Sequence, residues 1–549
     1  MFNRRSVLKG TLAVPALLLA GESGFAQATD DYGVASGEPQ PDGVLLWTRV
    51  PEAFQGSGAV TVRYEVAADS GFSTIVATGS QVTDASSDYT VKVRVSGLAA
   101  FSRYYYRFTS DTGYTSVTGR TKTAPAAGSE PARLTFAYVS CQDFTQGYYT
   151  VFAAIVADDD ADFCVHLGDN IYETGAADFQ KGQVRLDTIG GGEATTLDEY
   201  RQKYRLYLSD ANYREVRRQF CWIHLWDDHE VFNNYAGTEL TSASDEARQA
   251  AGYQAFLEYL PVEPVSPLAI GSDGKASVQL YRKLSFGSLA DLFVLDERQY
   301  RDGVVCKSDL FTPPCPELDD PARTMLGTSQ KTWLKDNLAA SAARWKVILN
   351  EVMAMRFAAI DISLFGPTGQ APRYFDRALP IKNPRLYQGA NQDLINSLTL
   401  YINLDAWDGY PAERQELLQF IGDRQIKNVV FWTGDIHNCY AGLLKPDFTD
   451  PNSPTVAVEV VGGSVSSAGV YELVGGLNLT ALGRLLLQAT NPHILYLDLK
   501  YHVYSKAVIT PDSMQVSYRA VKSIVSTTSS RFTLKSFTIP NGQPQLIVN

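Results

Sequence analysis

Three short polar strings constrain the fold of this chain most, because each directly follows an apolar run of strand length. They are His166–Tyr172 (HLGDNIY), Trp226–Glu230 (WDDHE) and Thr433–His437 (TGDIH). In open α/β sheets, the loops beyond the carboxyl ends of strands line the ligand crevice. Together the strings offer carboxylates, imidazoles and a phenol, a donor set that suits multivalent cations. The sequence therefore predicts a metal-dependent hydrolase of the α/β class.

The length and charge of the chain narrow this prediction. A chain of 549 residues is too long for one compact core, so we expect two domains and a leader. The formal net charge is −12, and removing residues 1–28, with Arg4, Arg5, Lys9 and Glu22, takes it to −14. Such an acidic protein lacks the basic surface that binds nucleic acid non-specifically. We therefore expect no specific nucleic-acid partner.

The first 28 residues have the pattern of an export signal. Arg4-Arg5 precedes an apolar stretch, Thr11–Ala20, and a small-residue site at Ala26-Gln27-Ala28. This predicts a twin-arginine signal peptide over residues 1–28. The alternative, a membrane anchor, fits less well because the apolar stretch is about half of a bilayer-spanning helix. We expect a periplasmic or secreted protein that is exported by the twin-arginine translocation machinery and has no integral membrane segment.

Residues 29–125 predict a small all-β domain. Val60, Val62, Tyr64 and Val66 alternate with polar residues in the two-residue period of half-buried strands. A second such run is Tyr89–Val95, and Gly97-Leu98 followed by Tyr104, Tyr106 and Phe108 is similar to the corner and late strand of a fibronectin/Ig-like sandwich. The loop-like stretch Thr123–Pro131 marks the boundary of this domain.

Residues 132–549 predict a layered α/β catalytic domain, because strand-like and helix-like runs alternate. The predicted strands are Leu134–Ser140, Phe163–Leu167, Phe220–Leu225, Asp291–Leu295, Trp345–Leu349 and Asn428–Trp432. The predicted helices are Ser244–Leu260, Ser329–Ala343 and Pro411–Ile421. The last stretch, Arg531–Asn549, fits either a terminal strand or an ordered tail.

Most of the six cysteines do not suggest a disulfide framework. Cys306 and Cys315 bracket a short loop, where an oxidising compartment would allow a disulfide, and the sequence leaves open whether it forms. Cys164 and Cys221 lie inside apolar runs and are expected to be buried thiols. Cys439 fits either the core or the surroundings of the third string.

The strings pair donors at short spacings. Asp169 and Tyr172 are three residues apart, which lets a carboxylate and a phenol reach one cation, and a phenolate is a strong ligand mainly for a ferric ion. Asp435 with His437, and Asp228 with His229, give two further carboxylate–imidazole pairs.

With Val139-Ser140-Cys141 upstream, these strings resemble the PhoD-type alkaline phosphatase and phosphodiesterase family, which is related to the purple acid phosphatases. Other segments resemble the same family: Gly33–Pro39, Leu46–Arg49, Tyr281–Arg282, Leu295–Arg301, Trp345–Val347 and Trp407–Pro411. The resemblance implies a metallophosphoesterase sandwich behind the N-terminal domain.

The resemblance also implies a two-metal site. Cys141, Asp169, Tyr172 and His437 would surround a ferric ion (Fe3+), and Asp169 would bridge to a calcium ion (Ca2+) held with Asp228 and Asp435. His229 would stabilise the transferring phosphoryl group or protonate the leaving oxygen. Asn233 and Asn350 are weaker ligand candidates, and His166 and His224, which lie in strands, are better interpreted as satisfied core histidines.

The implied activity is hydrolysis of small phosphate esters by a metal-bound hydroxide. No Gly-x-Ser-x-Gly elbow or P-loop occurs in the sequence, which disfavours a serine phosphoenzyme and a nucleotide-phosphate cradle. Two alternatives stay open: a phospholipase D-like diesterase acting on lipid headgroups, and a catalytically silent surface binding protein. We expect a monomer, and the preferred ester and the number and identity of the divalent ions are left open.

Overall fold

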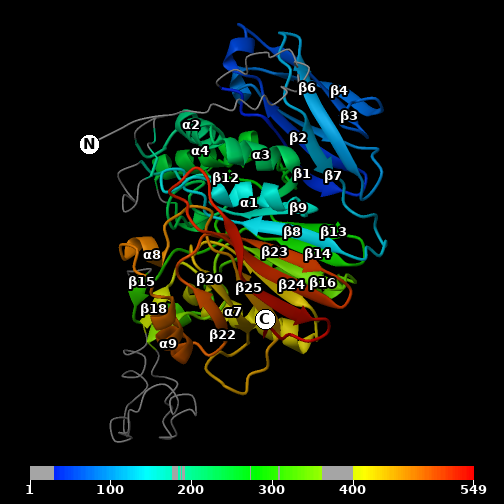
Figure 1. Cartoon of the computed structure of the whole chain (residues 1–549). Helices are drawn as coiled ribbons and strands as arrows, with labels where there is room; N and C mark the ends of the chain where they lie inside the picture. The colour runs from blue at the N-terminus through cyan, green and yellow to red at the C-terminus, as the bar shows by residue number, and fades with distance from the viewer. Residues whose placement is uncertain are drawn as a thin grey trace, which may run out of the picture.

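The computed structural model describes residues 30–175, 184–185, 187, 192–240, 242–272, 274–306, 310–360 and 400–549. The predicted leader, residues 1–28, lies outside these ranges. Two large β-sheets lie at the centre of the described chain, with helices on their outer faces (Figure 1). None of the described helices is both long enough and apolar enough to cross a membrane. The chain is a mixed α/β protein.

The larger sheet has ten strands. In order across the sheet they are β26 (Ile547–Val548), β25 (Arg531–Pro540), β24 (Ser513–Val521), β23 (Val503–Ile509), β8 (Leu134–Val139), β9 (Phe163–Leu167), β10 (Cys221–Leu225), β1 (Val34–Gln40), β2 (Gly43–Arg49) and β5 (Thr90–Val95). The neighbours β8, β9, β10 and β1 run parallel to one another. The segment Arg531–Asn549, which the sequence left open, supplies the edge pair β25–β26.

The second sheet has seven strands. In order they are β13 (Arg282–Phe286), β14 (Ala290–Val294), β16 (Trp345–Asn350), β19 (Val429–Thr433), β21 (Ala457–Val461), β20 (Cys439–Leu444) and β22 (Ile494–Asp498). Its centre, β14, β16, β19 and β21, is parallel. The six strands predicted for the catalytic part are confirmed to within one residue at each end.

The two sheets pack face to face through aromatic side chains. The ring centroids of Phe136 and Tyr138 on β8 lie 5.5 Å and 4.9 Å from that of Trp432 on β19, and Phe136 lies 5.2 Å from Phe286. These strands are buried on both faces, which is why they read as nearly continuous apolar runs. Large buried rings contribute much of the packing energy between such layers.

Helices cover the outer faces of both sheets (Figure 1). On the ten-stranded sheet they are α1 (Thr150–Asp158), α2 (Leu197–Leu208), α3 (Ala211–Gln219) and α4 (Ala243–Tyr259). On the seven-stranded sheet they are α5 (Gly327–Ala340) and α7 (Pro411–Asp423). The layers therefore follow the order helix, sheet, sheet, helix. The three predicted helices are confirmed, with ends shifted by up to three residues.

The N-terminal part forms a β-sandwich, but it is not separate from the main sheet. β4 (Ile75–Thr83), β3 (Val60–Ala67), β6 (Arg103–Ser110) and β7 (Gly119–Lys122) form one layer, and β1, β2 and β5 form the other. β1 also pairs with β10, with Gly37 opposite Trp222. A Cβ on Gly37 would lie 2.2 Å from Pro261 O, so only glycine fits at this junction. The two domains share one continuous sheet.

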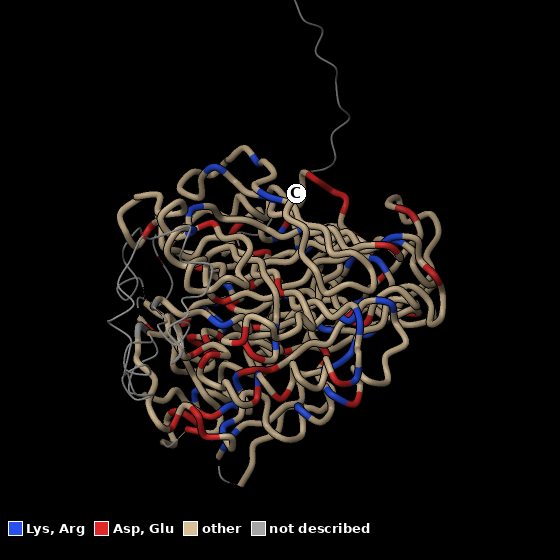
Figure 2. Tube along the Cα trace, turned by 90° about the horizontal axis from the view of Figure 1, so that it is seen from below, with Lys and Arg blue, Asp and Glu red and all other residues tan. Residues whose placement is uncertain are grey.

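The remaining elements lie around this body. They are β11 (Ala269–Ile270), β12 (Ala276–Ser277), β15 (Leu310–Thr312), β17 (Ala358–Ile360), β18 (Leu400–Asn403), α8 (Val470–Leu473), α9 (Thr480–Thr490) and five short 3-10 helices among the described residues, Glu52–Phe54, Ala85–Ser87, Gly237–Glu239, Pro316–Asp319 and Trp407–Gly409. Cys306 and Cys315 form a disulfide, which the sequence left open. Acidic and basic residues are interspersed along the described trace (Figure 2).

Candidate metal centre

The predicted site residues lie on loops at the carboxyl ends of four strands. Cys141 follows β8, Asp169 follows β9 and Asp228 follows β10, and these three strands are parallel neighbours in the ten-stranded sheet. Asp435 follows β19 of the opposing sheet, and the Cys141 thiol donates to its backbone carbonyl over 3.6 Å. The packing of the two sheets therefore brings strings that are far apart in the sequence to one place.

The backbone of these loops is strained. Cys141, Asp169, Asp435 and His437 have φ angles of 58°, 57°, 65° and 55°, in the left-handed region that side chains other than glycine rarely adopt. Such residues cost of order 1–3 kcal/mol each and cluster at functional sites. Gly168 permits the close approach behind Asp169, since a Cβ there would lie 2.5 Å from Asp227 Cβ. The fold thus holds four donor-bearing residues in unfavourable conformations at one point.

The first group of donors consists of Cys141, Asp169 and His437, whose ligand atoms all lie within 4.8 Å of one another. Tyr172 joins them, because its hydroxyl lies 2.7 Å from Asp169 Oδ2 and 3.0 Å from His437 Nε2. His437 Nδ1 lies 2.9 Å from Ala468 O, to which it donates, so Nε2 is the nitrogen that faces the group. All four predicted donors therefore converge.

The second group consists of Asp169, Asp228 and His229, again with ligand atoms within 4.8 Å of one another. Asp169 belongs to both groups. His229 Nδ1 lies 2.7 Å from Glu173 Oε2, and Asp228 Oδ2 accepts the backbone N–H of Asn234 at 2.6 Å. One carboxylate thus connects two clusters of donor atoms, which is the arrangement that a bridging ligand requires.

Asp435 is placed differently from the other predicted ligands. Its carboxylate is in neither donor group of the described residues, and its Oδ1 lies 3.9 Å from Arg298 Nη2. The same nitrogen lies 3.7 Å from Asp228 Oδ1. Asp435 therefore borders the second group across a guanidinium.

The electrostatics of the site favour a bound cation. Burial raises the pKa of Asp169, of the Cys141 thiol and of the Tyr172 phenol well above their ordinary values. Asp169 Oδ1 and Asp228 Oδ1 are buried and have no hydrogen-bond partner among the described residues. A cation would satisfy these oxygens and hold the donors deprotonated. The residues therefore fit a metal centre.

Neighbouring charges shift the pKa values of Asp228 and His229, whereas burial dominates at His437. Burial raises the pKa of Asp228, but the Arg298 guanidinium and His229 outweigh it and hold that pKa below its ordinary value. Burial lowers the pKa of His229, but Glu173, Asp228 and Asp169 outweigh it and raise that pKa. Burial lowers the pKa of His437 to about 4, so this imidazole is a neutral donor. A neutral His437 is in the protonation state that metal binding needs.

Three further residues belong to the site but were not predicted. Glu173 contacts His229, and Arg298 lies among carboxylates that include Asp405. Asp405 lies before the short helix Trp407–Gly409 and contacts both Arg298 and Arg301. The signal for Arg298 was the charged run Asp296–Arg301 directly after an apolar strand, which has the same form as the three strings.

The weaker candidates do not join the donor groups of the described residues. The Asn233 side chain is exposed, and the Asn350 amide contacts Val352 O, Thr433 Oγ1 and the Trp407 indole. His166 and His224 are buried strand residues with lowered pKa values, as expected for core histidines. His166 differs from the prediction in one respect, since neither ring nitrogen has a partner among the described residues. Cys164, Cys221 and Cys439 are buried free thiols.

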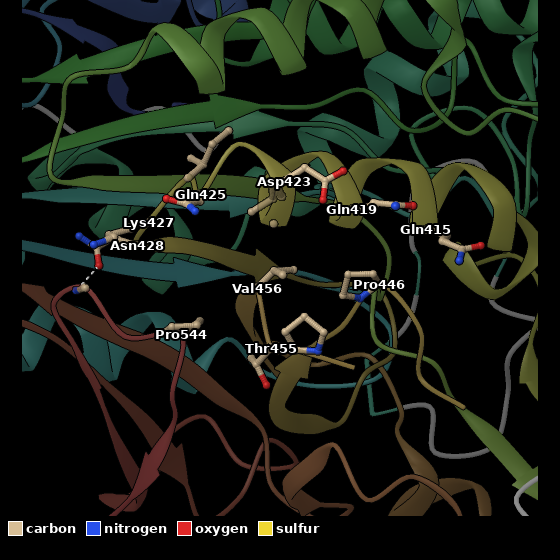
Figure 3. Close-up of a pocket in the computed structure, with 15 residues that line it drawn as sticks. Gln415, Gln419, Asp423, Gln425, Lys427, Asn428, Pro446, Thr455, Val456 and Pro544 are labelled. Carbon is tan, nitrogen blue, oxygen red and sulfur yellow. Dashed lines mark hydrogen bonds between the residues drawn. The ribbon is translucent and has the colours of Figure 1, made fainter. Parts of the chain in front are cut away.

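A surface pocket lies away from these donors. It has a volume of about 580 Å³ and is lined by α7 and the loops that carry Gln425, Pro446, Val456 and Pro544 (Figure 3). Asn428, which also lines it, precedes β19, whereas Asp435 follows that strand. The pocket is therefore at the opposite end of β19 from the candidate metal centre.

Comparisons with known proteins agree with this geometry. The profile of the PhoD-like phosphatase family matches residues 136–518, and that of the N-terminal domain of PhoD-like phosphatases matches residues 18–125. Alkaline phosphatase D of Bacillus subtilis (strain 168) is 35% identical over 568 residues, which cover 99% of this chain and 89% of that protein. The solved structure of PhoD superposes with a TM-score of 0.81 and 33% identity, covering 96% of this chain and 93% of the other. This chain belongs to the PhoD-like phosphatase family and is a phosphoric ester hydrolase.

Proposed function

We propose that this chain is an exported, metal-dependent hydrolase that acts on both phosphate monoesters and diesters through one site. Family membership supports the reaction class, and the Arg4-Arg5 leader supports export. The helix–sheet–sheet–helix layers support a metallophosphoesterase sandwich over residues 132–549, with a fibronectin-like domain over residues 29–125. A clamp on a phosphorus centre does not require a monoester, so both ester types are expected as substrates.

The metal assignment depends on one observation above all, the presence of Asp169 in both donor groups. Cys141, Asp169, Tyr172 and His437 would hold a ferric ion, since thiolate, phenolate and imidazole suit it. Asp169 would also serve a calcium ion together with Asp228 and Asp435, because carboxylate oxygens suit this hard cation.

When bound, the two cations would supply positive charge for the phosphoryl group and lower the pKa of a nucleophilic water. The protein residues do the rest. The strained loops fix the donors, and burial excludes bulk water from Asp169 and Tyr172. Glu173 Oε2 accepts the N–H of His229 Nδ1. This contact orients the ring so that its other nitrogen can protonate the leaving oxygen.

The deciding experiment is metal and activity analysis of Asp169→Asn. The exported protein is assayed with p-nitrophenyl phosphate and its bis-ester at alkaline pH, and its iron and calcium are measured by elemental analysis. We expect the variant to lose both metals and both activities, because one carboxylate serves both groups. Asn233→Ala is the control, since its exposed side chain is in neither group.

A variant of Asp169 that kept both metals and both activities would overturn the assignment. We also expect a chelator to abolish activity, and calcium to restore it better than zinc or magnesium does.

A lipid-headgroup diesterase is the second candidate function, and an apolar surface beside the site favours it. α8 begins two residues after Ala468, which contacts His437. Leu473 at its end, and Leu477 and Leu485 beyond it, are 56%, 61% and 50% exposed. Such a surface suits a lipid interface. Faster hydrolysis of vesicular phosphatidylcholine than of soluble glycerophosphocholine would favour this candidate, and equal rates would argue against it.

A further inference from the structure

Arg298 occupies the space between the two carboxylates proposed for the second cation. It lies on the loop after β14, where Asp296 Oδ1 accepts the backbone N–H groups of Arg298 and Gln299 at 3.3 Å and 2.9 Å. This turn points the side chain inward, and the guanidinium is 0% exposed. A buried guanidinium must be paired with charges, and its partners identify what it does.

The three side-chain nitrogens of Arg298 face carboxylates on three separate loops. Nε contacts Asp227 Oδ1, and Nη1 lies 2.6 Å from Asp405 Oδ2. Nη2 faces Asp228 Oδ1 at 3.7 Å and Asp435 Oδ1 at 3.9 Å. Two nitrogens thus anchor the group, while the third faces both proposed cation ligands.

The distances at Nη2 are too long for hydrogen bonds. Nη2 and Asp228 Oδ1 are both buried without a hydrogen-bond partner among the described residues. The guanidinium therefore offsets the charge of Asp228 and Asp435 but does not occupy their oxygens. Asp228 Oδ2 already accepts the backbone N–H of Asn234, so Oδ1 is the oxygen left for a cation.

We propose that Arg298 is the positioning residue of the second cation site, setting the separation of Asp228 and Asp435 for a hard divalent ion. This inference depends on the proposed function, because it assumes that these two carboxylates are ligands. Arg298 does not touch the iron donors Cys141 and Tyr172 in any described contact. Its role is therefore specific to the second cation.

The geometry also explains why the residue is an arginine. Asp227 and Asp228 follow a strand of the ten-stranded sheet, whereas Asp435 follows a strand of the opposing sheet. A planar guanidinium can contact carboxylates in several directions at once, whereas a lysine ammonium offers only one compact charge. Arg298→Lys should therefore keep the charge but release Asp228 and Asp435 from their fixed separation.

The test measures calcium binding directly on iron-loaded protein. Calcium affinity of Arg298→Lys is determined by calorimetric titration, and iron content is determined by elemental analysis. We expect calcium affinity to fall about tenfold or more while iron content is unchanged, as for other residues that orient metal ligands. Unchanged calcium affinity would overturn the proposal.

Arg414→Lys is the matched control. Arg414 is also a buried arginine in an ion pair, 2.7 Å from Asp408, and it has no described contact with Asp405, Asp228 or Asp435. We expect its calcium affinity to stay within about threefold of wild type, below the usual effect of losing an orienting group. An equal loss in both arginine variants would indicate general damage and would also overturn the specific role of Arg298.

The experiment also separates misfolding of the variant and failure of the proposed function from failure of the role of Arg298. If Arg298→Lys does not fold, Asp405→Asn removes an anchor of the guanidinium without touching Asp228 or Asp435, and it must weaken calcium binding or the proposal fails. If wild-type protein binds iron and hydrolyses esters but binds no calcium, the proposed second site itself is wrong. Calcium binding in the wild type with no change in Arg298→Lys would refute only the role of Arg298.

Discussion

Replacing Glu173 with glutamine perturbs the contact that orients the imidazole of His229. Glu173 Oε2 lies 2.7 Å from His229 Nδ1, and Oε1 accepts the backbone N–H of Asn233 at 3.0 Å. Both side chains are buried. Glutamine has nearly the same shape, but its single carbonyl oxygen can serve only one of these two donors. The variant therefore removes the negative charge beside the ring while it keeps the volume of the side chain.

The size of the effect follows from the distance. A unit charge pair 2.7 Å apart interacts by roughly 1.5 kcal/mol in a water-like medium and about 6 kcal/mol at the effective dielectric constant near a protein surface. Each 1.4 kcal/mol, roughly, of lost transition-state stabilisation costs about tenfold in rate. We therefore expect a loss of about 100-fold where proton donation by His229 limits the reaction.

The assay compares two leaving groups. An alkyl phosphate needs its departing oxygen protonated, whereas p-nitrophenolate leaves as a stable anion. Glu173→Gln should thus lose about 100-fold in kcat on the alkyl ester but less than about threefold on the p-nitrophenyl ester. The control is Glu193→Gln, because Glu193 pairs with nearby Arg248 at 2.6 Å but forms no described contact with His229. Equal losses on both esters, with metal content unchanged, would refute the reasoning.

Four more predictions concern individual side chains and the arginine pair of the leader. Tyr172→Phe should bleach or shift the visible absorption of the purified protein, because phenolate bound to a ferric ion gives charge transfer; a colourless, active wild type would contradict this. Changing Arg4 and Arg5 to lysine should leave precursor in the cytoplasm on cell fractionation, and efficient export would exclude the twin-arginine route. Each carboxylate oxygen of Glu230 accepts two N–H groups, so the amide of Glu230→Gln would leave two of these donors unpaired. The variant should therefore lower the free energy of unfolding by about 2 to 6 kcal/mol in denaturant titrations, and a loss under about 1 kcal/mol would contradict this prediction. Burial lowers the pKa of Lys92 from 10.5 to about 8, so the unfolded state binds more protons than the folded state between these two pH values. The free energy of unfolding should therefore rise with pH in this range, by at most about 3 kcal/mol. Lys92→Met should remove this rise, and an equal rise in the variant would contradict the prediction.

The sequence predicted the part of the site that depends on local pattern. Apolar runs identify strands, and the carboxyl ends of neighbouring parallel strands must meet at one edge of a sheet. Cys141, Asp169 and Asp228 follow the adjacent strands β8, β9 and β10, so their convergence needs no knowledge of the loops. The periodicity of Val60–Val66 likewise predicts the N-terminal sandwich layer.

The parts that the sequence did not predict depend on contacts between distant residues. Arg298 and Asp405 are more than a hundred positions apart, and nothing in either segment indicates that they meet. β1 contains Gly37 and Pro39, which are unfavourable in strands, yet it lies between β10 and β2 in the main sheet. Tertiary pairing outweighs local propensity there, so the join between the two domains was not visible in the sequence.

The cost of building this site connects its chemistry with the proposed export route. Four residues held at positive φ, and carboxylate oxygens buried without hydrogen-bond partners among the described residues, make the metal-free loops unfavourable. Binding of the proposed cations would offset these costs and so couple metal affinity to the folding of the loops. The proposed twin-arginine signal would direct the folded protein across the membrane, which would allow the donors to take the proposed iron before export. On this route, variants that weaken the iron donors, such as Cys141→Ala, should reduce the amount of exported protein as well as its activity. A variant at His229, which is proposed to act in the reaction and is not among the proposed iron donors, should be exported in normal amounts.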